Sequence, residues 1–187
     1  MSTTEGPRAD VLVVHASKAG GTAGIAALIA DELRAQGLRV HVAPATDVDH
    51  LTGYRSVVLG SALYMRRWRP EAVRFLRRHA VMLRGRPVWL FQSGPCGPDA
   101  AEQAEAGVPE PANIRRLREG VDAEAPITFG GVLDPASARG FVAKWMARGG
   151  LAGDFRDPER IRGWARVIAE EIRPAEPSGR SEVLPVG

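Results

Sequence analysis

The apolar positions of this chain change from an unbroken run to a helical spacing within its first segment. Val11 to Val14 form a continuous apolar run, and apolar residues then recur three and four positions apart at Ile25, Leu28, Ile29 and Leu33. A continuous run is typical of a parallel strand that is buried on both faces. The second spacing is typical of a helix that packs one face on a sheet. Residues 10–33 are therefore predicted to form a strand, a loop and a helix.

The same alternation of strand and helix patterns continues along the chain. Further strands are predicted at 38–42, 56–60, 86–91 and 126–131, and further helices at 47–51, at 70–83, within 101–119 and around 161–172. The strand at 38–42 alternates polar and apolar residues, which favours a half-exposed position at the sheet edge. Strands that alternate with helices indicate a parallel sheet covered on both faces. The predicted fold class is therefore α/β, a three-layer α/β/α sandwich.

Length and composition favour a single domain. The chain has 187 residues, 44% of them apolar, which is enough for one core. Residues 1–8 and 174–187 are polar or rich in proline and are expected to be disordered tails around a domain at 9–173. No apolar stretch is long enough to span a membrane and no secretory signal precedes the first strand, so a cytoplasmic location is expected. The single cysteine and the scattered histidines lead us to expect no disulfide and no metal site.

The loop after the first strand has the residues of an anion site. Ser17 and Thr22 bracket a Gly-Gly pair at the start of the predicted helix, where backbone N–H groups and hydroxyls favour an anion. The loop matches neither Gly-x-x-x-x-Gly-Lys-Ser/Thr nor Gly-x-Gly-x-x-Gly. Two interpretations remain: a loop that binds a phosphomonoester, or a plain strand-to-helix turn.

Two further predicted strands also end in unusual segments. Residues 61–68 combine aromatic and basic side chains in what we expect to be a loop, and residues 92–98 are rich in glycine and proline. Parallel sheets bind ligands outside the carboxyl ends of their strands. We therefore expect three loops to converge on one crevice.

Basic residues are concentrated in the middle of the chain, although the net charge is only +3. An anionic ligand, a nucleic acid or an anionic lipid surface would be attracted by such a cluster, and a solvated helix face would look the same in sequence. The cluster consists of Arg66, Arg67, Arg69, Arg74, Arg77, Arg78, Arg84 and Arg86.

A late segment, 137–151, has the pattern of an amphipathic helix. Its apolar residues fall on one side and basic residues lie towards the edges of that stripe. This arrangement fits a helix that contacts a membrane surface, and it equally fits a helix that packs on the core. The apolar residues are Phe141, Val142, Trp145 and Met146, and the basic ones are Arg139, Lys144 and Arg148.

These motifs together resemble one family. Residues 11–171 resemble the flavodoxin-like family of menaquinone-dependent protoporphyrinogen oxidases in the loop at 17–22, in Gly-Ser-Ala-Leu-Tyr-Met-x-x-Trp at 60–68 and in Ser-Gly-Pro-x-Gly at 93–97. Segments 129–135 and 153–157 also look like signatures of this family. The resemblance implies a flavodoxin-like fold with a five-stranded parallel sheet of order 2-1-3-4-5, and FMN as the cofactor. Ala19 and Gly21 depart from the usual Thr/Ser-x-Thr-Gly-Asn-Thr loop.

The resemblance also assigns residues to the cofactor. It implies that the FMN phosphate is held by Ser17, Lys18, Ala19, Gly20, Gly21 and Thr22. One side of the flavin ring would be flanked by Ala62, Leu63, Tyr64, Met65 and Trp68, and the other by Ser93, Gly94, Pro95, Cys96 and Gly97. Tyr64 or Trp68 would stack on the ring, the alternative for each being simple packing. An anionic substrate would meet Arg66, Arg67 and Arg69. No pair of His, Asp or Glu identifies itself as catalytic.

Three functional hypotheses follow. The first is an FMN-dependent oxidoreductase that oxidises an anionic small molecule, protoporphyrinogen IX, and passes electrons to a quinone, with contact to the inner face of the membrane through 137–151. The second is an electron-carrier flavodoxin with protein partners, against which the net positive charge argues. The third is a regulatory protein without flavin, suggested by Ala19 and Gly21. We expect no nucleic-acid partner, and the oligomeric state stays open.

Overall fold

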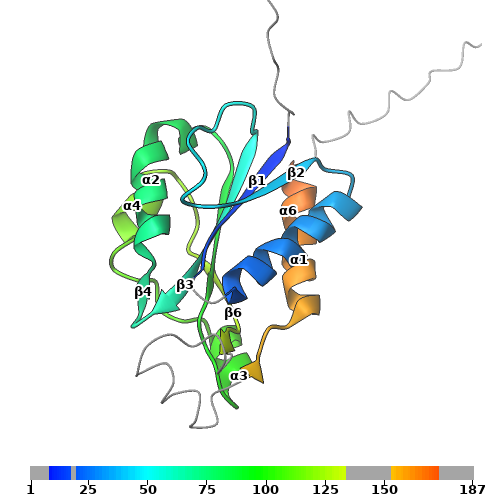
Figure 1. Ribbon diagram of the computed structural model, residues 1–187, viewed down its shortest axis with the longest axis vertical. Helices are drawn as coiled ribbons and strands as arrows, with labels where there is room; N and C mark the ends of the chain where they lie inside the picture. The colour runs from blue at the N-terminus through cyan, green and yellow to red at the C-terminus, as the bar shows by residue number, and fades with distance from the viewer. Residues whose placement is uncertain (1–8, 18–19, 134–152, 173–187) are drawn as a thin grey trace, which may run out of the picture.

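A computed structural model describes residues 9–17, 20–133 and 153–172 of the chain (Figure 1). Within these ranges strands and helices alternate along most of the chain, as the sequence pattern predicts. The elements are β1 (Val11–Ala16), α1 (Gly21–Ala35), β2 (Val40–Pro44), β3 (Ser56–Tyr64), β4 (Arg67–Trp68), α2 (Pro70–Leu83), β5 (Val88–Ser93), α3 (Ala100–Ala106), α4 (Arg115–Glu119), β6 (Ile127–Phe129), β7 (Val132–Leu133), β8 (Gly153–Asp154) and α6 (Pro158–Ile172).

The central sheet is parallel, with the order β2-β1-β3-β5-β6. β1 lies between β2 and β3, with Val11 opposite Val40 on one side and Ser56 on the other. When the short strand β4 is set aside, this is the predicted order 2-1-3-4-5, and the predicted fold class is confirmed. β2 lies at the edge of the sheet, and all of its residues except Ala43 are exposed or half-exposed, as its alternating pattern predicts.

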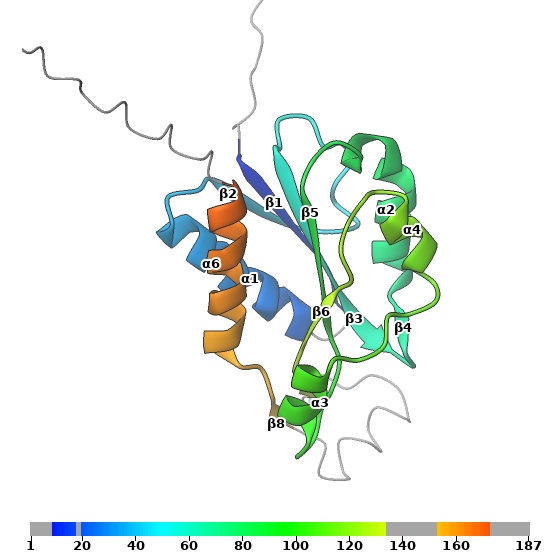
Figure 2. The same ribbon diagram turned by 180° about the vertical axis from the view of Figure 1, so that it is seen from behind.

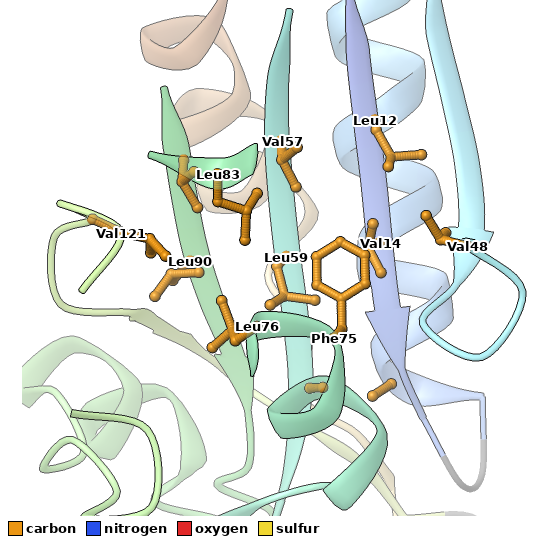
Figure 3. Close-up of a cluster of buried hydrophobic side chains, with 14 of the residues drawn as sticks. Leu12, Val14, Val48, Val57, Leu59, Phe75, Leu76, Leu83, Leu90 and Val121 are labelled. Carbon is orange, nitrogen blue, oxygen red and sulfur yellow. The ribbon is translucent and has the colours of Figure 1, made fainter. Parts of the chain in front are cut away.

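Helices cover both faces of this sheet. α2 and α4 lie on one face, while α1 and α6 lie on the other (Figures 1 and 2). Successive residues of β1 point to opposite faces: Leu12 and Val14 join the core beneath α2, and Val11 and Val13 join the core beneath α1 and α6. Figure 3 shows the first of these cores, with Phe75 of α2 among the strand side chains. Burial on both faces explains why β1 contains no polar alternation.

The helix predicted at 47–51 is wrong. This stretch contains no helix; it is irregular and lies between two turns, which are closed by bonds from the Asp47 N–H to the Pro44 carbonyl and from the Tyr54 N–H to the Leu51 carbonyl. Val48 and Leu51 are both buried in the core beneath α2. Their spacing of three residues is helical, but here it reflects two side chains of an irregular segment that reach the same core.

The loop predicted at 61–68 is also wrong, because β3 continues to Tyr64 and the chain returns as β4. Leu63 pairs with Trp68 and Tyr64 with Arg67 in an antiparallel hairpin. The two residues of the turn, Met65 and Arg66, have φ values of 48° and 58°. A tight hairpin turn requires positive φ at both positions, and sequences usually supply Asn and Gly there. The sequence Met-Arg therefore gave no signal of a hairpin.

Three of the expected segments lie outside the described residues, namely the two tails and the amphipathic segment 137–151. Within the described ranges, no helix is both long enough and apolar enough to cross a membrane.

Candidate functional site

The carboxyl ends of β1, β3 and β5 lie together at one edge of the sheet, the lower end in Figures 1 and 2. The register aligns Ala16 with Ser61, and Ala62 with Ser93. The residues that follow β1, the hairpin at the end of β3 and the residues that follow β5 therefore meet at this edge. We call it the ligand edge. It is where parallel sheets of this kind bind their ligands.

The first turn of α1 opens onto the ligand edge without a side-chain cap. Gly20 precedes the helix with φ 84°, a left-handed conformation that favours glycine, and within the described ranges no side chain caps the helix N-terminus. The first turn carries no acidic residue. Uncapped N–H groups and the helix dipole together favour an anion at this position. Ser17 is half-buried beside the turn, whereas Lys18 and Ala19 lie outside the described residues.

Thr22 makes a buried hydrogen bond within the fold. Its side chain is 1% exposed, and its Oγ1 lies 2.8 Å from the Oγ of Ser93, so one of these hydroxyls donates to the other. The bond joins α1 to β5. Donation from the Thr22 hydroxyl to a phosphate stays a prediction, and the backbone N–H groups and Ser17 are the other groups that could bind an anion.

The two aromatic residues of the hairpin have opposite environments. Tyr64 is 52% exposed at the tip, beside the exposed Met65. Trp68 is only 2% exposed, and its indole Nε1 donates to Gln92 Oε1 at 3.0 Å. Trp68 is thus a core residue, and the expectation that it stacks on a ring does not match its burial. Tyr64 is the hairpin aromatic that a ligand can reach.

The loop after β5 is fixed by the chain that follows β6. The Gly94 N–H donates to the Phe129 carbonyl at 3.3 Å, and the Gly131 N–H donates to the Pro95 carbonyl at 2.7 Å. Ser93, Pro95 and Gly97 are buried, while Gly94 and Cys96 are half-buried. Leu63 of the hairpin packs so closely on Gly94 that an added Cβ would lie 2.8 Å from its Cδ1. Ala62 and Leu63 are themselves half-buried, so the hairpin and this loop contact each other directly.

Two titratable groups near the ligand edge are shifted by burial. Burial raises the pKa of the Cys96 thiol, so the thiol stays protonated at neutral pH and is a poor nucleophile. Burial lowers the pKa of His15, an effect that Asp47 partly offsets. The buried His15 Nδ1 makes no hydrogen bond in the described part of the chain.

A buried polar network lies beneath the ligand edge and was not identified from the sequence. Gln92 is 0% exposed; its Nε2 donates to Thr128 Oγ1 at 3.0 Å and to the Val108 carbonyl at 3.2 Å, while its Oε1 accepts from Trp68. The network thus joins the hairpin, β5, β6 and the chain after α3. A glutamine that directly follows the apolar run Val88–Phe91 was its only sequence signal.

The arginine cluster divides into several groups. Arg66 and Arg67 are exposed at the hairpin tip and form no ion pair with any described residue. Arg69 instead pairs with Glu71 at 3.1 Å, and its backbone N–H donates to Ser61 Oγ, so the expectation that it binds substrate is not matched. Three further arginines of the cluster bond to a carboxylate or to backbone carbonyls. Arg78 pairs with Asp49, Arg84 donates to the Gly120 carbonyl, and Arg86 donates to the carbonyls of Leu51 and Tyr54.

A hollow of about 510 Å³ lies between α2 and the turns after β2, and part of the predicted arginine cluster lines it. Its lining includes Thr46, Val48, Arg74, Phe75 and Arg77. Arg74 and Arg77 are exposed and make no ion pair with the described residues. The sequence predicted a basic cluster here, with either an anionic ligand or a solvated helix face as its interpretation.

Comparison with known proteins places the fold in a family. The sequence matches the family described as Flavodoxin domain over residues 12–132. Among solved structures, rubredoxin oxygen:oxidoreductase of Desulfovibrio gigas aligns with 87% of this chain at 15% identity and a TM-score of 0.57, although the chain spans only 35% of that protein. Oxidised Flavodoxin 2 from Bacillus cereus aligns over 87% of this chain and 99% of its own length at 21% identity, with a TM-score of 0.58.

A flavodoxin from Streptococcus pneumonia TIGR4 aligns over 86% of this chain and 98% of its own, at 23% identity and a TM-score of 0.55. The comparison with curated proteins finds no match. These structural likenesses establish the fold, and the family match covers most of the chain, from β1 to β7. The chain belongs to the flavodoxin-domain family.

Proposed function

We propose that the protein binds FMN at the ligand edge and acts as a flavin-dependent oxidoreductase. The observation that carries this proposal is the uncapped N-terminus of α1, which opens directly beside the Tyr64 hairpin and the loop at 93–97. A phosphate group would meet the backbone N–H groups that follow Gly20, and the Ser17 hydroxyl. Bound FMN supplies the redox chemistry, because it accepts and releases electrons.

The protein's own contribution is binding and positioning. The glycine-rich backbone at 20–21 accommodates the phosphate, while the hairpin and the loop at 93–97 are held against each other by the Leu63–Gly94 contact. Tyr64 has the exposure needed for a ring to stack on it. The protonated Cys96 thiol would be a neutral wall of the ring site. These features support a site for a planar ligand that carries a phosphate.

A flavin titration tests this proposal. We expect the purified protein to quench FMN fluorescence saturably at micromolar concentrations. Riboflavin, which lacks the phosphate, should bind more weakly because it cannot use the N-terminus of α1. A protein that quenches neither flavin and shows no heat of binding with either would leave a protein without flavin as the better hypothesis.

The finer proposal is that the substrate is a porphyrinogen, protoporphyrinogen IX, and that a quinone reoxidises the flavin. The sequence resemblance supports it, and so do Arg66 and Arg67, exposed at the hairpin tip beside the ligand edge. Protoporphyrinogen carries propionates, and a guanidinium presents two parallel donors to a carboxylate. Each dehydrogenation would remove a hydride, which carries two electrons to the flavin, and a proton, which goes to solvent. The quinone would then take up the two electrons and two protons and become a hydroquinone.

We expect Arg66→Ala combined with Arg67→Ala to leave FMN affinity unchanged and to slow anaerobic flavin reduction by porphyrinogen. The wild-type rate should fall with rising salt, because screening weakens an exposed attraction. Arg74→Ala combined with Arg77→Ala is the matched control: it removes the same charge from α2, away from the hairpin. Equal slowing by both double variants would mean that only net charge matters and would contradict a docking role for the hairpin.

An electron carrier is the second candidate, because the same exposed arginines suit an acidic protein surface. The two candidates differ in the electron donor. FMN-loaded protein that porphyrinogen does not reduce, but that a flavodoxin reductase does reduce, would be a carrier. In that case Arg66 and Arg67 would form its docking face.

A further inference from the structure

The segment that follows β8 lies against the start of α1. β7 and β8 pair in antiparallel fashion, with Val132 opposite Asp154. Val132 in turn lies so close to α1 that a Cβ added to Gly21 would be 3.3 Å from the Val132 Cβ. The paired strands β7 and β8 are therefore packed on the first turn of α1, and they bring the residues after β8 to the same place.

Arg156 is held in one orientation by Asp154. Its Nε donates to Asp154 Oδ1 at 2.8 Å, its Nη2 donates to Asp154 Oδ2, and its backbone N–H also donates to Oδ1 at 3.2 Å. The Arg156 side chain is 25% exposed. These bonds use one edge of the guanidinium fork. They leave Nη1 outside the pair, with no hydrogen bond to the described residues.

The unpaired Nη1 occupies the position that a side chain would have on Gly24. A Cβ added to Gly24 would overlap Arg156 Nη1, so the guanidinium fits only because residue 24 is a glycine. The Gly24 N–H donates to the Gly20 carbonyl at 2.9 Å, which closes the first turn of α1. Nη1 therefore lies within about one helical turn, roughly 5 Å, of the uncapped N–H groups. The bonds to Asp154 and the absence of a Cβ on Gly24 together place the guanidinium against the first turn of α1.

We propose that Arg156 is the residue that selects a phosphorylated ligand at this edge. This inference rests on the proposed flavin function, and it names a determinant of affinity for the phosphate group. The Arg156 guanidinium, whose positive charge is partly offset by the paired Asp154 carboxylate, adds to the partial positive charge of the α1 N-terminus. The Thr22 hydroxyl is bonded to Ser93, and Nη1 offers the phosphate a donor that does not depend on that hydroxyl. Riboflavin, without the phosphate, gains nothing from Arg156.

The experiment compares the affinities of FMN and riboflavin for the wild type and four variants. Arg156→Gln removes the charge, and Gly24→Ala displaces the guanidinium while leaving it in the chain. Both should lower the ratio of FMN to riboflavin affinity about tenfold, the scale of a screened attraction between a cation and a phosphate. Arg156→Lys should keep part of the preference. Gly163→Ala, on α6 where an added Cβ meets nothing, should behave as the wild type.

The outcomes separate the two proposals. If the wild type binds both flavins and Arg156→Gln and Gly24→Ala keep its affinity ratio, Arg156 does not select the phosphate, although the flavin site stands. If the wild type binds neither flavin, the proposed function fails and this inference fails with it. Thermal midpoints identify a variant that no longer folds, and Gly24→Ala then decides the question, because alanine favours the helix that it enters.

Discussion

Phe91→Ala is expected to lower the free energy of unfolding by about 3–5 kcal/mol, the range for truncating a buried aromatic side chain. Phe91 is 0% exposed in the centre of β5. Its ring lies 6.1 Å from the ring of Phe129 and 6.1 Å from that of Trp164, both measured between centroids. Removing it opens a void between the sheet and α6. Urea denaturation measures the loss, and Val81→Ala, at an 81% exposed position, should change stability by less than about 0.5 kcal/mol.

Gly60 gives this prediction a second test. A Cβ added to Gly60 would overlap the Phe91 ring, so Gly60→Ala alone should destabilise the protein by about 1–3 kcal/mol through overpacking. In the Phe91→Ala background the same methyl group fills part of the void. The double variant should therefore lose less unfolding free energy than the sum of the losses of the two single variants. Strict additivity would contradict the packing of Phe91 on Gly60.

Gln92→Leu is expected to lower the free energy of unfolding by about 2–4 kcal/mol, because leucine fills the space but leaves buried partners unsatisfied. The Trp68 indole N–H and the Val108 carbonyl each lose a hydrogen bond that they make to Gln92. The urea midpoint measures the effect. Gln103→Leu, on the exposed surface of α3, is the matched control and should be nearly neutral.

A second substitution tests whether Trp68 and Gln92 stabilise the protein through the hydrogen bond that they share. Trp68→Phe removes only the indole N–H and its hydrogen bond to Gln92, so it should destabilise the protein by less than Gln92→Leu. Once residue 92 is leucine, Trp68→Phe should cost little further for hydrogen bonding, since the bond is already absent. Losses that simply add would mean that Trp68 and Gln92 act separately.

The central sheet was predictable because its signals are local. An unbroken apolar run such as Val11–Val14 identifies a strand with two covered faces, and the alternating run at 38–42 identifies the edge strand. Ends of parallel strands meet at one edge, so the convergence of the loops at 17, 62 and 93 followed from the pattern. The prediction of a helix at 47–51 was wrong because two buried residues of an irregular segment share the helical spacing.

The parts of the candidate site that sequence reasoning missed depend on tertiary contacts. Whether the Thr22 hydroxyl faces a ligand or Ser93 depends on how α1 packs on β5, and the two residues are far apart in the chain. Trp68 is buried because the hairpin folds it over Gln92. Arg156 reaches Gly24 only through the pairing of β7 with β8. None of these contacts has a periodicity that a single sequence can show.

The location of bound flavin is the most direct test of the ligand edge. Amide chemical shifts of the isotopically labelled protein, followed through an FMN titration, report which backbone N–H groups meet the ligand. We predict that the largest saturable changes fall at 20–24, 62–66 and 93–97. The shifts of Thr46 and Arg74, at the hollow between α2 and the turns after β2, should not change. Changes that cluster around that hollow, or no saturable change at 20–24, would contradict a flavin site at the ends of β1, β3 and β5.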